Sequence, residues 1–372
     1  MIRTFRYPLE PNRFQAATMG VWIERCRQLY NACLEQRIAV WKMKQKSLSF
    51  FDQCKELTEL RAADPDFASA PVDVERSAIR RLQRAFENFF RSVKAGQTPG
   101  FPRFRGRDRY DSFDCGSTAR IDGDHVILPK LGSIRFNLYR PLKGEILAVG
   151  VQRRAGRWFM TAACDIGAAP EKRPVRKGRA VGIDLGLTSF AVLSDGTDIA
   201  NPRFFRAGEA LLADRQRKLV RKRRGSKSRR TAKLLVAKAH EHVRNQRLNF
   251  VRKLACDLFS RFDLVAHEDL SISRMVRGNL AKSINDAAWG LFIHALTSKA
   301  ECAAKYAVAV DPRGTTVDCS MCEFKVPKTL SEREHRCPNC GFVAGRDHNA
   351  ALNILARGLR VASLPAGSEV RN

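Results

Sequence analysis

Two pairs of cysteines constrain the fold of this chain more than any other feature of the sequence. The pairs lie in CSMC at 319–322 and CPNC at 337–340, with 14 residues between them. Two CxxC turns at this separation supply four thiolates to one tetrahedral Zn²⁺, and a closed four-sulfur shell is structural rather than catalytic. We therefore predict a small zinc module that holds one structural ion through Cys319, Cys322, Cys337 and Cys340.

Two details of this module stay open in the sequence. His335 stands two residues before Cys337 and is an alternative ligand, although we favour the four cysteines. Gly341 follows the second pair and permits a left-handed backbone, whereas Glu323 occupies the matching place after the first pair and predicts a less regular turn there. The chain has eleven cysteines, and the others are scattered singly, which indicates buried thiols in a reducing compartment.

Three acidic residues in separate contexts suggest a second metal centre. Asp184 ends the apolar run AVGID, Glu268 ends DLVAHE, and Asp347 opens a helix in RDHNAALNIL. If the two strands are neighbours and the helix packs on their sheet, the carboxylates meet at one edge. Carboxylate oxygens suit Mg²⁺, and two ions about 3.5–4 Å apart can activate water and stabilise a leaving oxygen. We predict phosphodiester hydrolysis with two Mg²⁺ ions, for which Mn²⁺ could substitute, although any one of these acids could be a simple turn or cap.

Other acids and histidines near this centre rank lower. Asp269 should point away from the face of Glu268, and Asp311 precedes a proline in a common turn arrangement. Asp286 is a third nearby acid without a matching context. Strand alternation puts His267 on the other face, whereas His348 follows Asp347 and is a more plausible participant.

The charge of the chain indicates a polyanionic partner. There are 67 Lys and Arg against 38 Asp and Glu, a formal net charge of +29, and nucleic acid is the commonest partner for such a chain. Positive charge is densest at 215–233, on a helical pair that we expect beside the acidic centre; a plain solvated face is the alternative. The candidate backbone contacts are Arg215, Lys218, Arg221, Lys222, Arg223, Arg224, Arg229 and Arg230.

Membrane association is not expected. No run of 18 apolar residues is present, and the N-terminal MIRTFRYPLEPNR carries charge where a signal peptide needs an apolar core. We predict a cytoplasmic protein without a membrane partner.

The chain is organised as helices, then short strands, then alternating strands and helices. A strand at 2–8 precedes predicted helices at 12–45, 49–62 and 72–95; short strands from 110 to 168 suggest a small β-barrel, and an α/β domain begins at 178. It includes helices within 207–260 and 284–305. Helix 72–95 carries the apolar stripe Ile79, Leu82, Phe86, Phe90 and Val93, which we interpret as bundle core in preference to a partner groove.

Several of these motifs, in this order, resemble the TnpB family of transposon-encoded proteins, which is related to type V CRISPR effectors. The resemblance rests on VGIDLG, the HEDL context, INDAAWG, CSMC with CPNCG, and RDHNAALNIL, and on LQRAFENFFRSVKAGQTPGFPRFR in the N-terminal half. Asp184, Glu268 and Asp347 fall on the family's catalytic acids, and the four cysteines fall on its zinc ligands. Gly345, where an acid is common, and Glu323, where glycine is common, depart from the pattern without removing a ligand.

The resemblance implies a mixed, multidomain α/β fold. A RuvC-like nuclease domain of the RNase H fold, with an inserted zinc ribbon, would follow a β-barrel wedge domain interrupted by a helical recognition domain. The implied boundaries are 1–11 and 105–172 for the wedge, 12–104 for the recognition domain, 178–312 and 342–360 for the nuclease, 313–341 for the zinc ribbon, and 361–372 for a disordered tail.

The resemblance also implies the activity, which is RNA-guided cleavage of double-stranded DNA beside a short flanking motif. The implied partners are a guide RNA of the omega type from the element's end, target DNA and the displaced single strand, bound by a monomer in the prokaryotic cytosol and associated with the nucleoid. Two alternatives stay open: an RNA-guided DNA-binding regulator that no longer cuts, and a RuvC-like nuclease that needs no guide. A transposase is disfavoured, because no catalytic Tyr–His arrangement stands out.

Overall fold

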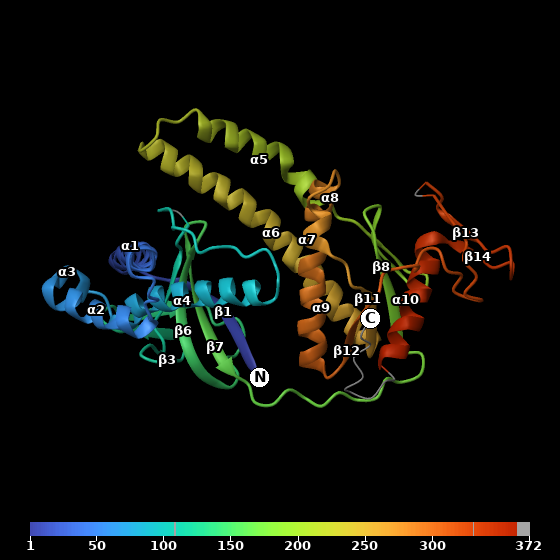
Figure 1. The fold of residues 1–372 in the computed structure, drawn as a ribbon, viewed down its shortest axis with the longest axis horizontal. Helices are drawn as coiled ribbons and strands as arrows, with labels where there is room; N and C mark the ends of the chain where they lie inside the picture. Colours follow the sequence, from blue (N-terminus) through green and yellow to red (C-terminus); the bar gives the residue numbers. More distant parts are fainter. Residues whose placement is uncertain (108, 330, 363–372) are drawn as a thin grey trace. The chain divides into compact units, whose positions relative to one another are not determined.

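The chain forms two compact units, Met1–Ala168 and Ala169–Asn372, each with its own sheet and core (Figure 1). The structure is a computed structural model that describes residues 1–107, 109–329 and 331–362. Its described helices and strands agree with the expected mixed α/β class. The tail that we expected at 361–372 lies almost wholly outside the described residues.

The first unit combines four helices with seven strands among its described residues. In chain order these are β1 (Ile2–Glu10), α1 (Arg13–Lys44), α2 (Phe50–Ala63), α3 (Pro65–Ala68), α4 (Val72–Lys94), β2 (Ser112–Asp114), β3 (Arg120–Asp122), β4 (His125–Leu128), β5 (Gly132–Phe136), β6 (Glu145–Arg154) and β7 (Arg157–Asp165).

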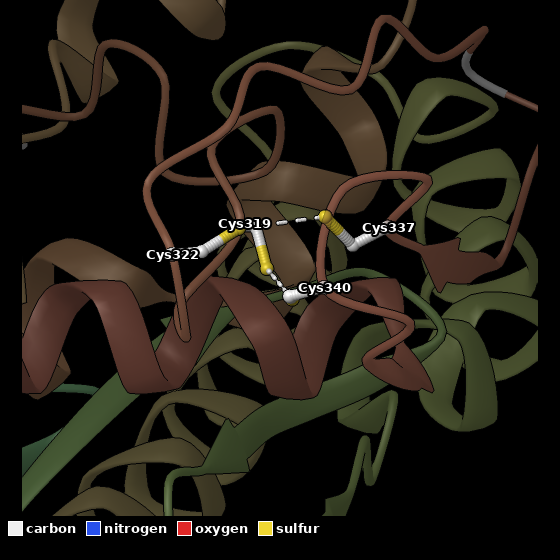
Figure 2. A group of neighbouring side chains, drawn as sticks. All are labelled: Cys319, Cys322, Cys337 and Cys340. Carbon is white, nitrogen blue, oxygen red and sulfur yellow. Dashed lines mark hydrogen bonds between the residues drawn. The ribbon is translucent and has the colours of Figure 1, made fainter.

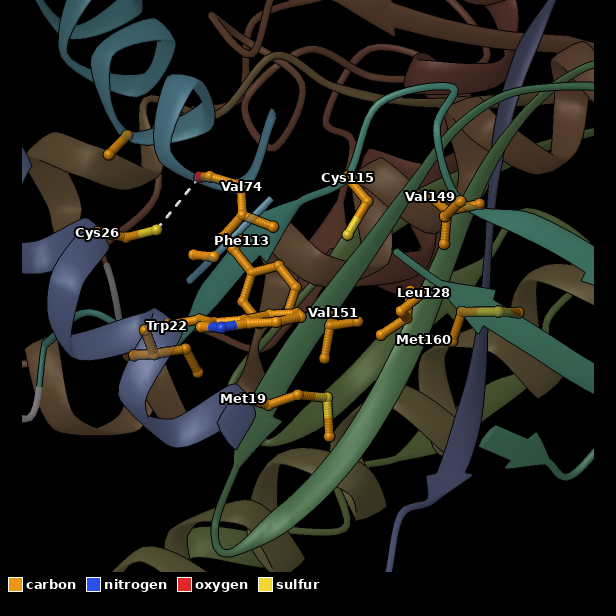
Figure 3. Packing of buried hydrophobic residues seen from close by; sticks show 14 of the residues in the cluster. Met19, Trp22, Cys26, Val74, Phe113, Cys115, Leu128, Val149, Val151 and Met160 are labelled. Carbon is orange, nitrogen blue, oxygen red and sulfur yellow. Dashed lines mark hydrogen bonds between the residues drawn. The ribbon is translucent and has the colours of Figure 1, made fainter. Parts of the chain in front are cut away.

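The strands that we predicted as a small β-barrel form one antiparallel sheet. Its order is β2-β6-β7-β1-β5-β4-β3, so the N-terminal strand β1 lies between β7 and β5. Helix α1 begins with a capping box in which Asn12 and Gln15 satisfy each other's free backbone N–H groups. The core joins this helix to the sheet, with Trp22 of α1 edge-on to Phe113 of β2 at 5.7 Å between ring centroids (Figure 3).

The apolar stripe of α4 is core at one end only. Ile79 and Leu82 are fully buried, as predicted, but Phe90 is 55% exposed and Val93 is 49% exposed. Interpreting the whole stripe as bundle core was therefore wrong. Near the end of this helix, Phe101 lies edge-on to Phe86 and Phe89, at 5.7 and 5.4 Å between ring centroids, while Phe90 and Val93 stay half-exposed.

The second unit contains the other described elements. In chain order these are β8 (Ala180–Leu185), β9 (Ser189–Leu193), β10 (Asp198–Ala200), α5 (Phe204–Val220), α6 (Lys227–Arg261), β11 (Leu264–Glu268), α7 (Ile272–Met275), α8 (Ala281–Ala287), α9 (Trp289–Ala303), β12 (Tyr306–Val310), β13 (Glu334–Arg336), β14 (Val343–Gly345) and α10 (Arg346–Ala362).

The sheet of the second unit is mixed and is covered on both faces. Its order is β10-β9-β8-β11-β12; β8, β11 and β12 are parallel to one another, and β9 is antiparallel to β8. Val181, Ile183 and Val265 pack with α6 and α9 on one face. Strand alternation puts Gly182, Asp184 and Glu268 on the other face, toward α10, which contacts β8 and β11.

Helix α10 approaches this face closely because two glycines leave room for it. A Cβ atom at Gly182 would lie 2.1 Å from the backbone oxygen of Ala351, and one at Gly358 would lie 2.4 Å from the Cβ of Ala266. Any larger residue at these positions would push the helix away from the strands. This close approach brings the start of α10 to the strand ends that carry the acids.

Replacing Gly182 by alanine is expected to destabilise the protein by about 1–3 kcal/mol, because the new methyl overlaps backbone atoms of α10 that cannot yield without moving the helix. Denaturant unfolding measures this loss. Gly345→Ala is the matched control, because a Cβ atom there meets nothing within 4 Å. Equal stability of the two variants would contradict the close approach.

The helix predicted at 284–305 is broken. Ala288 has a left-handed backbone with φ of +59°, so α8 ends and α9 begins at that residue. The break turns Asp286 back into the unit, where its oxygens accept from the backbone N–H of Phe205 and from Arg247, at 2.7 and 2.9 Å. Among the described residues, no helix is both long and apolar enough to cross a membrane.

Candidate functional site

The three predicted acids come together at one edge of the second unit's sheet. Asp184 lies near the end of β8, Glu268 is the last residue of β11, and Asp347 is in the first turn of α10. Parallel strands β8 and β11 are direct neighbours, with Ile183 opposite His267. The carboxyl ends of the two strands and the start of α10 thus meet, as the sequence predicted.

The pKa of Asp184 reflects the proximity of the other two acids. Burial, together with the negative charges of Glu268 and Asp347, raises the pKa of Asp184 to about 7, against a lowering by Arg346. The pKa of Glu268 is also raised, mainly by burial. Repelling carboxylates that are partly removed from water are the environment in which a divalent cation is favourable, because it replaces the missing counter-charge.

The three carboxylates do not converge on a single point that could hold one ion. Among the described residues, only the four cysteines form a group of three or more metal-binding side chains close enough to hold an ion as they stand. A site for two ions does not need all three carboxylates on one ion, since neighbouring ions share them. Three carboxylates at one sheet edge are oxygen donors of the kind that hard divalent cations take.

Two residues that the sequence analysis missed fix the orientation of the acids. The buried hydroxyl of Thr315 donates to Oε1 of Glu268 at 2.6 Å, and Nε of Arg346 donates to Oδ1 of Asp347 at 3.0 Å. Thr315 lies in the loop between β12 and the first cysteine pair. The sequence marks Thr315 only by its place four residues before Cys319. Its hydrogen bond to Glu268 joins residues 47 positions apart, which no local pattern shows.

The lower-ranked candidates have other contacts. Asp269 is exposed, and Asp311 accepts from the backbone N–H of Arg313 in a turn. His267 lies on the opposite face from Glu268 and is buried. His348 donates from Nε2 to the backbone oxygen of Ser194 at 3.2 Å, so this ring nitrogen is engaged in a structural hydrogen bond.

The four cysteines form a compact cluster (Figure 2). Their sulfur atoms all lie within 4.8 Å of one another, and the Cys319–Cys340 and Cys322–Cys337 pairs are 3.7 and 3.6 Å apart. A tetrahedron with Zn–S bonds of about 2.3 Å has S···S edges of about 3.8 Å. The spacing therefore fits one Zn²⁺.

Both cysteine turns have the same backbone pattern. Cys319 and Cys337 each donate to the backbone oxygen five residues on, at 2.9 Å, and each accepts from the backbone N–H four residues on. The residue after each pair is left-handed, with φ of +60° at Glu323 and +74° at Gly341. The expectation of a less regular first turn was wrong, because Glu323 adopts the glycine-like conformation.

Replacing Glu323 by glycine is expected to raise the stability of the zinc module by about 1 kcal/mol, because glycine adopts the left-handed conformation without steric cost. The side chain pairs with Arg360 at 2.7 Å, but both groups are exposed and such a pair contributes little. Thermal unfolding of the zinc-loaded protein measures the gain. Glu334→Gly, in the exposed strand β13, is the control and should lower stability.

His335 is not a ligand in this arrangement. Its ring is fully buried, Nδ1 contacts Nζ of Lys328, and the ring lies 6.1 Å from that of Phe342. The preference for four cysteines over His335 agrees with this packing.

The zinc module is tied to α10 through two asparagines. Asn349 accepts from the backbone N–H of Ser320 at 3.0 Å, and Asn353 donates to the backbone oxygens of Thr315 and Asp318 at 2.9 and 2.7 Å. The same helix carries Asp347, and Thr315 contacts Glu268. The loop that leads into the module is therefore part of the wall of the acidic site.

The basic run lies elsewhere than predicted. Helices α5 and α6 form a hairpin with its own small core of Leu212, Ala239 and Val243, and the run occupies its tip. Val251 is the first α6 residue in the core of the sheet, and at 1.5 Å per residue Arg229 is about 33 Å farther along the helix. The expectation that the run lies beside the acidic centre was wrong, because α6 extends well beyond the sheet.

Several residues of the run support the hairpin itself. Arg215 donates to the backbone oxygen of Leu235, Arg229 donates to that of Leu219, and Lys218 pairs with Asp214. The residues at 221–224 and Arg230 are exposed. These exposed cations, rather than the whole run, are available to a polyanion.

The fold and site thus define a two-unit, mixed α/β protein with a carboxylate cluster beside a four-thiol metal motif. A family described as "Probable transposase", OrfB of IS605, matches residues 163–279; the Cas12f1-like TNB domain matches 289–354; and a helix-turn-helix domain of the OrfB family matches 1–46.

Relatives match almost the whole chain. A "Putative RNA-guided DNA endonuclease" of Streptomyces pristinaespiralis is 33% identical, over 98% of this chain and 91% of its own length. The "Putative RNA-guided DNA endonuclease InsQ" of Escherichia coli (strain K12) is 26% identical, over 96% and 92%. The chain belongs to the TnpB family, that of the OrfB proteins of IS605 elements.

Solved structures support the fold. The chain resembles Cas12f1 in a complex with sgRNA and target DNA, with a TM-score of 0.58, 15% identity and coverage of 92% of this chain and 83% of that one. It also resembles the mini-RNA-guided endonuclease CRISPR-Cas_phi3, with a TM-score of 0.55, 10% identity and coverage of 100% and 93%.

Proposed function

We propose that the protein is an RNA-guided DNA endonuclease that cuts phosphodiester bonds at the site of Asp184, Glu268 and Asp347. The observation that carries the proposal is the meeting of three carboxylates at one sheet edge, with the pKa of Asp184 raised to about 7. Relatives over nearly the full length bear names that state the same activity. The sheet order and the helix on its acidic face support a RuvC-like, RNase H-type nuclease domain.

The three carboxylates would hold two Mg²⁺ ions, with Mn²⁺ as a substitute, and the ions would supply activation of water and stabilisation of the leaving oxygen. The chain's own residues prepare the site. Thr315 orients the Glu268 carboxylate, Arg346 orients that of Asp347, and Gly182 lets α10 approach close enough for Asp347 to face the strands.

The other parts have supporting roles in this proposal. The four cysteines hold one structural Zn²⁺, which fixes the loop that carries Thr315. The first unit, with its wedge sheet and helices α1–α4, binds a guide RNA of the omega type and a short DNA motif beside the target. The exposed cations at 221–224 bind nucleic-acid backbone without reading sequence.

The experiment expresses the chain with the flanking DNA of its element, sequences the RNA that co-purifies, and incubates the complex with a plasmid that carries the matching target and Mg²⁺. A defined RNA and a linear plasmid are expected. Complexes without RNA that cut equally well would favour the guide-independent nuclease. A defined RNA with target binding but no cutting would favour the inactive regulator.

A further inference from the structure

The first unit contains an apolar groove that the proposed cutting site does not use. It has a volume of about 930 Å³ and lies between α1, α2 and α4, with Phe101 of the following segment on its wall. Seven of its lining residues are aromatic, and they include Trp41, Phe51 and Phe90, which are 54%, 73% and 55% exposed. Rings so exposed on one surface are unusual unless something covers them.

A buried guanidinium points to the chemistry of the occupant. Arg37 of α1 lines the groove and is only 9% exposed. Its Nε donates to Gln53 and one terminal nitrogen donates to Gln83, at 2.9 and 3.0 Å, but Nη2 has no hydrogen-bond partner. The two partners are neutral amides, so neither offsets the positive charge. Nη2 is itself shielded from solvent, so this guanidinium contributes positive charge beside the groove rather than a free donor within it.

The rim of the groove is cationic. Lys42, Lys46 and Arg80 line it together with Arg37, and Glu87 is the one acid among the lining residues. The aromatic rings meet mainly edge to face, as Phe86 and Phe101 do at 5.7 Å and 88°. The rings that an occupant can reach are those of Trp41, Phe51 and Phe90, which are the exposed ones.

We propose that this groove binds an unpaired nucleobase of single-stranded RNA, stacked on the exposed aromatic rings, with its phosphates on the lysines of the rim. Stacking on aromatic faces beside a cationic track is a general mode of single-strand binding. A duplex offers no free base face, so a base in a duplex does not enter the groove. The inference rests on the proposed RNA-binding function and specifies where an unpaired part of that RNA is held.

Two other occupants fit the groove less well. An apolar peptide would leave the cations of the rim uncompensated. A second copy of the chain would bring two cationic rims together in a protein of net charge +29. An RNA strand supplies the flat ring and the negative charge together.

The test measures binding of a ten-nucleotide single-stranded RNA to the full chain freed of co-purified RNA, with the quenching of Trp41 fluorescence as the signal in wild type. A fluorescent label on the RNA reports affinity for the variants. Phe51→Ala/Phe90→Ala is expected to weaken binding about 5- to 100-fold, because each stacked base loses its aromatic partner. Phe14→Ala, which removes an exposed ring of α1 outside the groove, should change affinity less than about twofold.

Further measurements separate the outcomes. A 5-iodouridine strand is expected to crosslink to Trp41 or to the phenylalanines of the groove, and binding of a duplex of the same sequence should be unaffected by the double variant. Unchanged single-strand affinity in a folded double variant, or self-association of wild type that the variant abolishes, would overturn the inference. If wild type bound no RNA at all, the proposed function itself would fail, whereas equal binding by both proteins refutes the groove alone.

Discussion

Replacing Asp184 by asparagine is expected to abolish DNA cutting and, at the same time, to raise the stability of the metal-free protein. Cutting should fall on the order of 10³-fold or more, because the amide cannot provide the carboxylate that the metal ions need. Stability should rise because the folded state raises the pKa of Asp184 to about 7, so that ionising this carboxyl costs free energy.

The direction of this stability change follows from the coupling between protonation and folding. The carboxyl titrates near 4 when the chain is unfolded and near 7 when it is folded, so the metal-free wild type loses stability as pH rises from about 4 to about 7. Asparagine does not ionise, and Asp184→Asn should be more stable than wild type at pH 8 by about 1–3 kcal/mol. The difference should vanish near pH 4. Mg²⁺ should raise the melting temperature of wild type more than that of the variant.

Asp269→Asn is the matched control, because this acid is exposed and follows Glu268 directly. It should leave cutting unchanged. The account of the site would be wrong if Asp184→Asn kept full activity, or if it lost activity together with stability at pH 8.

Replacing Cys337 by serine is expected to remove the bound zinc and to disorder the loop that supports the acidic site. Structural Zn²⁺ contributes about 10–16 kcal/mol to small zinc modules, so the loss of one of four thiolates is severe. Thr315 and the asparagines of α10 connect the module to Glu268. Cutting should therefore fall although no acid has been changed.

Metal analysis and hydrogen exchange test this prediction. Wild type should contain one zinc per chain, and the Cys337→Ser protein well below one, with faster exchange at 313–345 and unchanged exchange in α1. Cys256→Ser, which alters an exposed single cysteine on α6, should behave as wild type. A variant that kept its zinc and its protection would exclude the proposed role of this cysteine.

The sequence predicted those parts of the site that local pattern determines. Asp184 and Glu268 end apolar strands and Asp347 opens a helix, so the pairing of the strands and the packing of the helix on their sheet bring them together. The cysteine cluster followed from its spacing. Thr315 could not be found in this way, because its role depends on a contact with Glu268 47 residues away.

The errors share a physical cause, which is that periodicity shows an apolar face but not what covers it. Phe90 continues the stripe of Leu82 at helical spacing, yet Leu82 is fully buried and Phe90 is 55% exposed. In the same way, the length of α6 carries the basic run away from the acids. Glu323 and Ala288 both adopt a left-handed backbone, a conformation that residues with a side chain usually avoid. Tertiary packing, which the sequence pattern does not show, overrides this local preference.

The most direct test of the central claim reprograms the RNA. The purified chain is assembled with two guide RNAs that differ only in the guide segment, and each complex is given two plasmids that carry one matching target each beside the same flanking sequence. Each complex is expected to cut only the plasmid that matches its guide, and Asp184→Asn complexes should cut neither. Cutting of both plasmids by both complexes, or cutting by the Asp184→Asn complexes, would contradict the account.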